Sequence, residues 1–275
     1  MPATLFLSDV DQLAARVTDG AKLALFKDSG VPMALGCALI RRGLRQLHLV
    51  TVPTGGMLPD MLIGAGCVTT VETSGVSLGE YGLAPRFVDA VKTGAVQILD
   101  STCPAIYAAL QAAQKGIPFM PLRGLIGSDI LTQRRDLRVI NNPFGDNDPI
   151  VALPAIIPDF ALFHACVADR AGNVYIGRQQ ELKLLAQAAR ASLVTVERYV
   201  DIDLMADAQL AVGTLSSLYV TAIAPAAHGA APSNLPGEYD FDRDALQAYA
   251  HAAASRAGFE AWLVMALAVP QTVAA

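Results

Sequence analysis

The sequence contains little charge and few aromatic residues. Charged side chains make up 16% of its 275 residues, with 20 Lys and Arg against 25 Asp and Glu, and aromatic side chains make up 6%. A phosphate backbone attracts clusters of Lys and Arg, so this mildly acidic composition argues against nucleic-acid binding. The low hydrophobicity typical of disordered chains is also absent, because 53% of the residues are hydrophobic.

Cysteine is scarce, and its spacing excludes two classes of site. The four cysteines lie far apart and form no Cys-x-x-Cys pair: Cys37, Cys67, Cys103 and Cys166. This spacing argues against a metal centre and against a disulfide framework, so we expect no metal ion and a reducing cytoplasm. Two of the scattered histidines, His48 and His164, fall within expected strands, which favours packing over ligand binding.

Long uninterrupted apolar runs are missing as well. The N-terminus has neither a basic region nor a long apolar core, so we do not expect a secretory signal. Residues 259–269 are too few to span a membrane and include Glu260. Residues 209–227 are numerous enough but are interrupted by Gly213 and Pro225. We therefore expect both segments to be buried elements of a cytoplasmic protein without membrane association.

A mean hydropathy of +0.41 is high for a chain with so few charges. A deep core rich in Ala, Val and Leu would account for it. The interpretation we favour is that another subunit covers part of the apolar surface. There is no internal repeat, and the polar, turn-rich residues 134–149 are expected to be a surface loop. We therefore expect a single domain over residues 1–275.

Apolar strand-like runs alternate with helix-like segments along the chain. This alternation predicts an α/β fold with an open, mostly parallel sheet and helices on both faces. The expected strands are residues 22–26, 47–52, 67–71, 96–99, 118–120, 150–153, 159–168 and 192–196. The expected helices are residues 32–42, 59–63, 85–92, 104–115, 181–190 and 242–257.

Ligands of open parallel sheets bind beyond the carboxyl ends of the strands, which directs attention to the loops after the first four strands. These loops are rich in Gly and small hydroxyl residues, which allow a ligand to approach the backbone closely. None contains a GxGxxG, GxxxxGK[ST], HExxH or GxSxG motif. The candidate substrate-binding residues in them are Lys27, Asp28, Ser29, Ser74, Gly75, Ser77, Glu80 and Ser101.

Two features of these loops each have two interpretations. Cys103 lies at a strand end before a helix, where the helix N-terminus would stabilise a thiolate, or it is a small packing residue. Cys103 is therefore the candidate catalytic residue, with no other catalytic side chain assigned. Lys27 and Asp28 either bind a carboxylate or phosphate, or pair with each other at the surface.

Several short motifs, in order and at matching spacing, resemble the alpha-type subunit of family I coenzyme A transferases over most of the chain. The most specific are residues 60–67 (DMLIGAGC) and residues 74–80 (SGVSLGE), of which the second resembles the glutaconate-transferase-like branch. Further matches are residues 19–20, 32–35, 118–119, 127–129, 168–174 and 194–197.

The resemblance implies an enzyme that moves CoA from an acyl-CoA to a free carboxylic acid, with the CoA-transferase alpha-subunit (NagB/RpiA-like) fold. It implies two related halves, of which this chain supplies one and a beta-type subunit the other. A glutamate of the beta half attacks the thioester, giving an enzyme-bound anhydride and then a glutamyl-CoA thioester. CoA is then a substrate, and no permanently bound cofactor is expected.

Two departures from the family pattern bear on the site. The family usually has a Gly-Gly-aromatic turn after the first strand, where this sequence has Phe26, Lys27 and Asp28. Related ring-opening hydrolases of steroid breakdown have an essential glutamate after the fourth strand, where this sequence has Cys103. Either the catalytic glutamate comes from the partner, or the site is rebuilt around Lys27, Asp28 and Cys103.

The leading hypothesis is the alpha subunit of a CoA transferase acting on a small, dicarboxylic acyl-CoA in carboxylic or aromatic acid catabolism. Ser74 and Ser77 would line the acyl pocket and Lys27 would add charge. The alternatives are a subunit of a carbon–carbon hydrolase of CoA thioesters and a non-catalytic scaffold subunit. The hydrolase requires a carboxylate near Cys103, from Glu80 or Asp100 for example.

Overall fold

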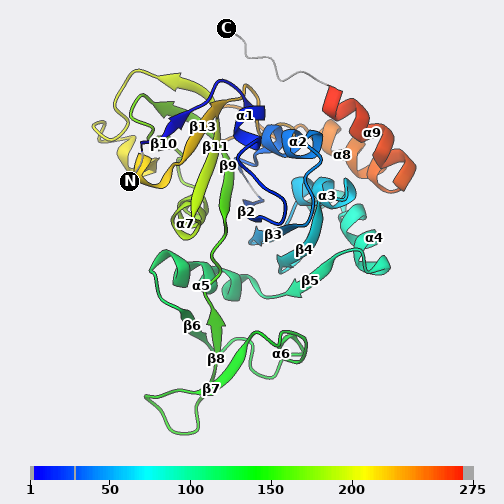
Figure 1. Ribbon diagram of the computed structural model, residues 1–275, viewed down its shortest axis with the longest axis vertical. Coiled ribbons are helices and arrows are strands. Elements are labelled where there is room, and N and C mark those ends of the chain that lie inside the picture. The colour runs from blue at the N-terminus through cyan, green and yellow to red at the C-terminus, as the bar shows by residue number, and fades with distance from the viewer. Residues whose placement is uncertain (1–2, 28, 269–275) are drawn as a thin grey trace.

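The computed structural model describes residues 3–27 and 29–268. Its main sheet has the strand order β1-β13-β11-β9-β2-β3-β4-β5, and every neighbouring pair on this path is parallel (Figure 1). The predicted open, mostly parallel sheet is confirmed. The strands of the path are β1 (Leu5–Phe6), β2 (Lys22–Phe26), β3 (Leu47–Val52), β4 (Val68–Thr73), β5 (Gln97–Asp100), β9 (Phe160–Asp169), β11 (Ala191–Val200) and β13 (Ala222–Pro225).

Side chains of successive strand residues point to opposite faces of the sheet. In β2, Leu23 and Leu25 enter one buried cluster, whereas Ala24 and Phe26 enter the other. Helices cover both clusters, as predicted from the apolar strands. The first cluster contains side chains of α1 (Val10–Ala14), α2 (Met33–Arg41), α3 (Met57–Gly64), α4 (Pro85–Thr93), α8 (Arg243–Ala253) and α9 (Arg256–Ala268), and the second those of α5 (Cys103–Gln114) and α7 (Gln180–Ala188).

The shorter elements lie at the margins of this sheet. The strands β10 (Val174–Tyr175) and β12 (Thr214–Leu215) pair antiparallel with each other, and β10 also pairs with β9. Three 3-10 helices lie in the connecting segments: η1 (Gly79–Tyr81), η2 (Ala211–Gly213) and η3 (Ser217–Tyr219).

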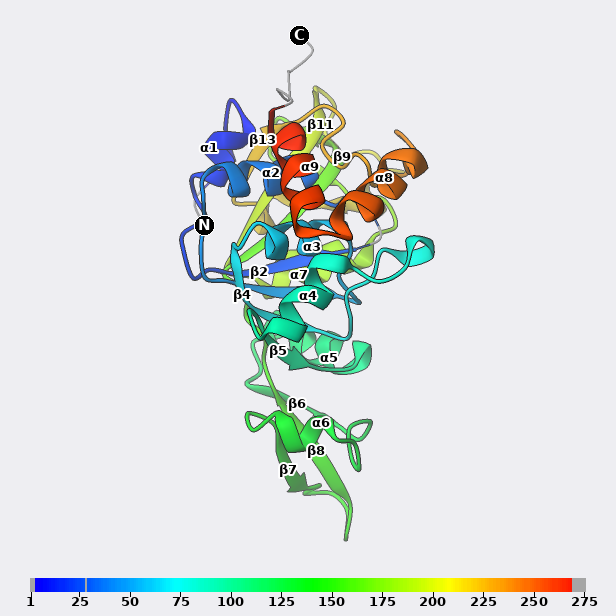
Figure 2. The same ribbon diagram turned by 90° about the vertical axis from the view of Figure 1, so that its right-hand side faces the viewer.

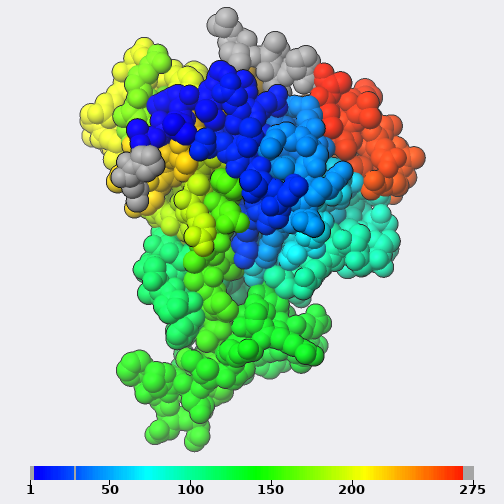
Figure 3. Space-filling model, in the orientation of Figure 1, coloured from blue at the N-terminus to red at the C-terminus, as the bar shows by residue number. Residues whose placement is uncertain are grey.

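Residues 119–154 form an arm that projects from the main body (Figures 1, 2 and 3). Its three strands, β6 (Phe119–Leu122), β7 (Arg138–Asn141) and β8 (Pro149–Pro154), make a separate antiparallel sheet in the order β6-β8-β7. The short helix α6 (Ile130–Gln133) precedes β7. The placement of residues 118–120 and 150–153 in the parallel sheet was therefore wrong. The expected loop at 134–149 contains β7, whose four residues are all exposed and lack any burial pattern that marks a strand.

The C-terminal part differs from the expected single helix at 242–257. Two helices, α8 and α9, pack on each other there. Phe259 is buried, but Val264 and Met265 are 70% and 73% exposed. The prediction of a buried element at 259–269 therefore holds only for one face of α9. Val269 lies outside the described residues. Within the described ranges, every helix is too short or too polar to cross a bilayer.

Arg134 joins the arm to the main sheet. Its Nη2 donates to Glu72 Oε1 of β4 at 2.8 Å, and its Nη1 donates to the carbonyl of Asp100 in β5 at 3.1 Å. Asp136 of the arm accepts two further hydrogen bonds from the same guanidinium. Both Arg134 and Glu72 are buried, and Arg134 is the guanidinium that compensates the Glu72 carboxylate, which also lies 3.6 Å from His48 Nε2.

We expect Arg134→Gln to lower the free energy of unfolding by about 3–5 kcal/mol, because the substitution removes the guanidinium that compensates the buried Glu72 carboxylate. Urea unfolding followed by circular dichroism measures the change. Arg123→Gln is the matched control, since Arg123 pairs with Asp148 on the exposed part of the same arm and should change stability little. Equal effects of the two substitutions would contradict the assignment.

Asp60 ties α3 to two other helices from a fully buried position. Its Oδ1 accepts the N–H of Phe87 in α4 at 2.7 Å, and its Oδ2 accepts the hydroxyl of Tyr249 in α8 at 2.7 Å. Burial raises the pKa of Asp60 to about 6, although both hydrogen bonds and the Arg86 charge lower it. The folded protein therefore favours the protonated carboxyl relative to the unfolded chain.

This raised pKa predicts a stability that depends on pH. The contribution of Asp60 is fully present below its ordinary pKa of 3.8 and is lost as the pH rises through about 6. Relative to Asp60→Asn, the free energy of unfolding of the wild type should fall by about 3 kcal/mol between about pH 4 and about pH 8. Denaturant unfolding of both proteins across this range measures the difference, and parallel pH profiles would contradict it.

Candidate active site

Backbone hydrogen bonds join the loops that follow β3 and β4. The N–H of Gly55 donates to the carbonyl of Gly75 at 2.8 Å, and the N–H of Ser77 donates to the carbonyl of Gly55 at 3.0 Å. The two loops therefore continue the parallel pairing of their strands, with Gly55 opposite Val76. A Cβ atom at Gly55 would lie 3.0 Å from both Val76 methyl groups, so this close approach favours glycine.

A cavity of about 350 Å³ lies at the carboxyl ends of β2, β3 and β4, and we call it the β4 cavity. Three of the predicted substrate-binding residues, Lys27, Ser77 and Glu80, line it together. Arg243, the first residue of α8, also lines it and donates through Nη1 to Glu80 Oε1 at 3.0 Å. The cavity thus combines two cationic side chains with one carboxylate at the sheet edge where ligands of this architecture bind.

Ser74 and Cys103 form a separate pair beside the loop after β3. Ser74 Oγ donates to the carbonyl of Pro53 at 2.6 Å, and Cys103 Sγ lies 3.0 Å from Ser74 Oγ. Since Ser74 has only one hydroxyl proton, the contact is best explained by the Cys103 thiol donating to Ser74. Cys103 opens α5, whose N-cap Thr102 accepts the N–H of Ala105. These contacts fix the position of the Cys103 side chain beside the loop after β3.

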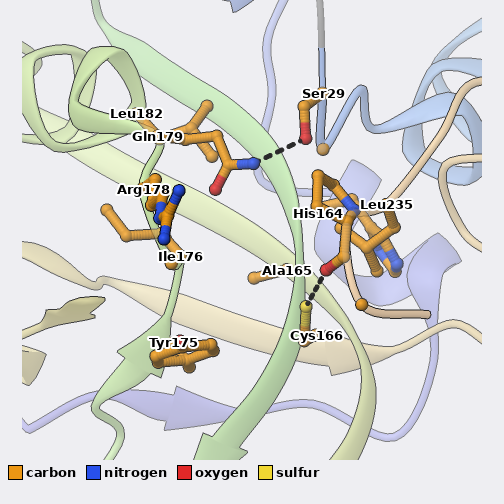
Figure 4. Close-up of a pocket in the computed structure, with 14 residues that line it drawn as sticks. Ser29, His164, Ala165, Cys166, Tyr175, Ile176, Arg178, Gln179, Leu182 and Leu235 are labelled. Atoms are coloured by element: carbon orange, nitrogen blue, oxygen red, sulfur yellow. Dashed lines mark hydrogen bonds between the residues drawn. The ribbon is translucent and has the colours of Figure 1, made fainter. Parts of the chain in front are cut away.

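Ser29 lines a second cavity, of about 430 Å³, which we call the β9 cavity (Figure 4). Gln179 Nε2 donates to Ser29 Oγ at 2.9 Å across it, and Cys166 Sγ donates to the carbonyl of Pro236 at 3.6 Å. Apolar side chains such as Leu182 make up much of the remaining wall. Ser29 therefore lies in a different cavity from Lys27, although both residues follow β2.

The remaining predicted residues lie elsewhere. Ser101 lines a third cavity, of about 130 Å³, together with Glu72 and Arg134. Gly75 has a φ of 146°, and its N–H donates to Thr73 Oγ1, whose hydroxyl in turn donates to the Gly75 carbonyl. Asp28 lies outside the described residues.

Glu197 of β11 is surrounded by hydrogen-bond donors. Its carboxylate accepts from His164 Nε2 at 2.7 Å, from the Tyr239 hydroxyl at 2.8 Å and from the N–H of His228 at 2.8 Å. Burial opposes ionisation, but these hydrogen bonds outweigh it and lower the pKa of Glu197 to about 2. Burial lowers the pKa of His164, whose Nδ1 lies 2.9 Å from Thr195 Oγ1. The donors fix Glu197 in place, so it is a structural carboxylate.

Arg243 is the charged residue of the β4 cavity that was not predicted from the sequence. The predicted residues all lie in loops at strand ends, whereas Arg243 begins a helix 163 residues beyond Glu80. The only sequence signal is an acidic and basic run before an amphipathic helix, at Asp242, Arg243 and Asp244. Such a run is typical of an exposed helix start and does not indicate a ligand.

The sequence model of the family described as Coenzyme A transferase matches residues 7–215. This chain belongs to the coenzyme A transferase family. It is 34% identical, over 255 residues, to the A-type chain of the 3-oxoadipate CoA-transferase of Pseudomonas knackmussii, which covers 90% of this chain and 88% of that relative. The predicted family and enzyme class are confirmed.

Two further comparisons describe how the family varies. The glutaconate coenzyme A-transferase structure from Acidaminococcus fermentans superposes with a TM-score of 0.87 at 26% identity, covering 95% of this chain and 88% of that chain. A cholesterol ring-cleaving hydrolase IpdA subunit of Rhodococcus jostii is 31% identical, covering 81% of this chain and 77% of that relative. Similar chains therefore carry the names of both transferases and hydrolases.

The four thiols should differ in reactivity. Burial raises the pKa of Cys37, of Cys67 and, to about 11, of Cys166, so their thiolate fractions are low. Cys103 and Cys166 are both partly exposed, but the raised pKa of Cys166 slows its reaction, so we expect iodoacetamide at mildly alkaline pH to label Cys103 first. Peptide mass spectrometry of the purified chain measures the four rates. Cys103→Ala should remove the fast phase, whereas faster labelling of Cys166 than of Cys103 would contradict the prediction.

Proposed function

We propose that this chain is the alpha-type subunit of a cytoplasmic two-chain CoA transferase that moves CoA between an acyl-CoA and a small dicarboxylic acid. The observation that carries the proposal is the β4 cavity, where Lys27 and Ser77 lie together at the carboxyl edge of the sheet. An ammonium group and a hydroxyl group suit the binding of a carboxylate. The family membership supports the same assignment, as do similar chains that are named as one component of a CoA-transferase.

The partner subunit would supply the nucleophile. Two glutamates of this chain that lie near the cavities are engaged: Glu80 pairs with Arg243, and the carboxylate of Glu197 is surrounded by donors. Glu197 is a poor nucleophile, because attack would cost its carboxylate these hydrogen bonds. A glutamate that a beta-type partner contributes to a shared cleft therefore fits the chemistry better than Glu197, and it leaves Glu80 to its exposed pair with Arg243.

In the proposed reaction the partner's glutamate attacks the thioester carbonyl, the carbon–sulfur bond breaks, and CoA leaves as a thiolate. The thiolate then attacks the glutamyl carbonyl of the resulting anhydride and releases the first acid. The second acid then attacks the glutamyl-CoA thioester and displaces CoA as a thiolate, which gives a new mixed anhydride. The thiolate attacks the acyl carbonyl of this anhydride, releases the glutamate and forms the new acyl-CoA. CoA is a substrate throughout, and the thioester energy is retained in the enzyme-bound intermediates.

The hydrolase is the second candidate, because the similarity to the cholesterol ring-cleaving hydrolase favours it. That reaction requires a carboxylate near Cys103. Glu80 is hydrogen-bonded to Arg243, and Asp100 Oδ1 accepts the N–H of Ser101 at 2.9 Å. Cys103 instead contacts Ser74 Oγ and the Pro53 carbonyl. The surroundings of Cys103 therefore favour the transferase.

Co-expression with the beta-type subunit of the same organism tests the proposal. We expect the complex to exchange CoA between succinyl-CoA and at least one acid of a mono- and dicarboxylic panel, measured by liquid chromatography of the CoA esters. This chain alone should show no exchange, because it lacks the proposed nucleophile. The absence of exchange with every acid, together with efficient hydrolysis of a cyclic keto-acyl-CoA, would favour the hydrolase. An exchange rate unaffected by Ser74→Ala, Lys27→Ala and Cys103→Ala would favour a scaffold role.

A further inference from the structure

Arg243 and Glu80 form an ion pair at the wall of the β4 cavity. Their side chains are 74% and 61% exposed, so water screens the pair and it adds little to stability. Another carboxylate can displace Glu80 from the guanidinium of Arg243, because breaking so exposed a pair costs little free energy. The pair therefore leaves a cation available at the cavity for an anionic ligand.

The other walls of the β4 cavity restrict what that ligand is. Met57, Leu78, Phe241 and Leu246 supply apolar surface between the polar groups. A chain of methylene groups suits such walls, and a carboxylate at its end suits an arginine, which binds both oxygens at once. A cavity of about 350 Å³ is in the range that small ligands occupy.

We propose that Arg243 determines specificity by binding the distal carboxylate of a dicarboxylic acid, with Glu80 occupying the guanidinium when the cavity is empty. The inference rests on the proposed function, because the other carboxylate of the acid must reach the reacting glutamate of the partner. Lys27, on the loop after β2, adds a second positive charge to the same cavity. A monocarboxylic acid of equal length that places its one carboxylate at the reacting end has only a methyl group to offer Arg243, and it leaves the Glu80 pair intact.

Isothermal titration of the two-subunit complex with glutarate and with valerate, which have the same number of carbons, tests the inference directly. Arg243→Gln should weaken glutarate binding by about 10- to 100-fold, the effect expected for a lost charge-assisted hydrogen bond, and should leave valerate binding unchanged. Arg243→Lys should restore part of the affinity, because it keeps the charge but not the planar geometry. Glu80→Gln should strengthen glutarate binding, since it removes the competing carboxylate.

Arg256→Gln is the matched control. Arg256 pairs with Glu260 on α9, with side-chain exposures of 61% and 58% that resemble those of the Arg243 pair, but it lies outside the β4 cavity. This substitution should leave the affinity for both acids unchanged. Equal loss of glutarate and valerate binding in Arg243→Gln, no loss in either, or an equal effect of Arg256→Gln would overturn the inference.

The same complexes, assayed for exchange with acetyl-CoA as donor, separate the inference from the proposed function. This donor has no distal carboxylate, so only the acceptor acid depends on Arg243. Glutarate binding that depends on Arg243, without exchange from either acetyl-CoA or succinyl-CoA to any acid of the panel, would support the binding site and contradict the transferase. Exchange with glutarate that is insensitive to Arg243→Gln would support the transferase and overturn the role of Arg243.

Discussion

The order of the parallel strands decides which side chains share a cavity. From the centre of the sheet, β2, β3, β4 and β5 run outward in one direction, and β9, β11, β13 and β1 run outward in the other. The boundary between β2 and β9 is a topological switch point, where the connections on the two sides diverge and leave a crevice at the carboxyl edge. The loop after β2 lies at this boundary, so Lys27 lines the β4 cavity whereas Ser29 lines the β9 cavity.

The segment after β13 completes both cavities, and Glu197 positions it. Ser233 lines the β4 cavity, and residues 235–237 line the β9 cavity. The Tyr239 hydroxyl donates to Glu197 and accepts the N–H of Ala230, which fixes both ends of this segment against β11. The same segment leads into Phe241 and Arg243 of the β4 cavity. The Glu197 carboxylate of β11 thus helps to position the segment that carries Arg243, the proposed specificity residue.

The sequence predicted the main sheet and its helices because both faces of the sheet are buried. Residues 47–52 are a mostly apolar strand flanked by helical periodicity, and the structure has β3 with the same bounds. The arm was placed wrongly because β6 and β8 are also short and apolar, and strand pairing depends on distant partners that local patterns do not specify. Lys27, Ser77 and Glu80 were predicted to lie near one another, because ligands of open parallel sheets bind beyond the carboxyl ends of the strands. Arg243 reaches the β4 cavity because the chain returns to the carboxyl edge of the sheet after β13. No local sequence pattern indicates this return.

The missing Gly-Gly-aromatic turn has a compensation within the neighbouring loop. Phe26 points into the buried cluster beneath α5 and α7, so its bulk does not occupy the carboxyl edge. The stem of Lys27 passes over Gly56, where a Cβ atom would lie 3.2 Å from Lys27 Cγ. Room for the larger side chain after β2 is therefore provided by a glycine after β3. Compared with a Gly-Gly-aromatic turn, which lets a ligand approach the backbone closely, Lys27 brings a positive charge to the same edge of the sheet. This charge favours an anionic substrate there over a neutral one.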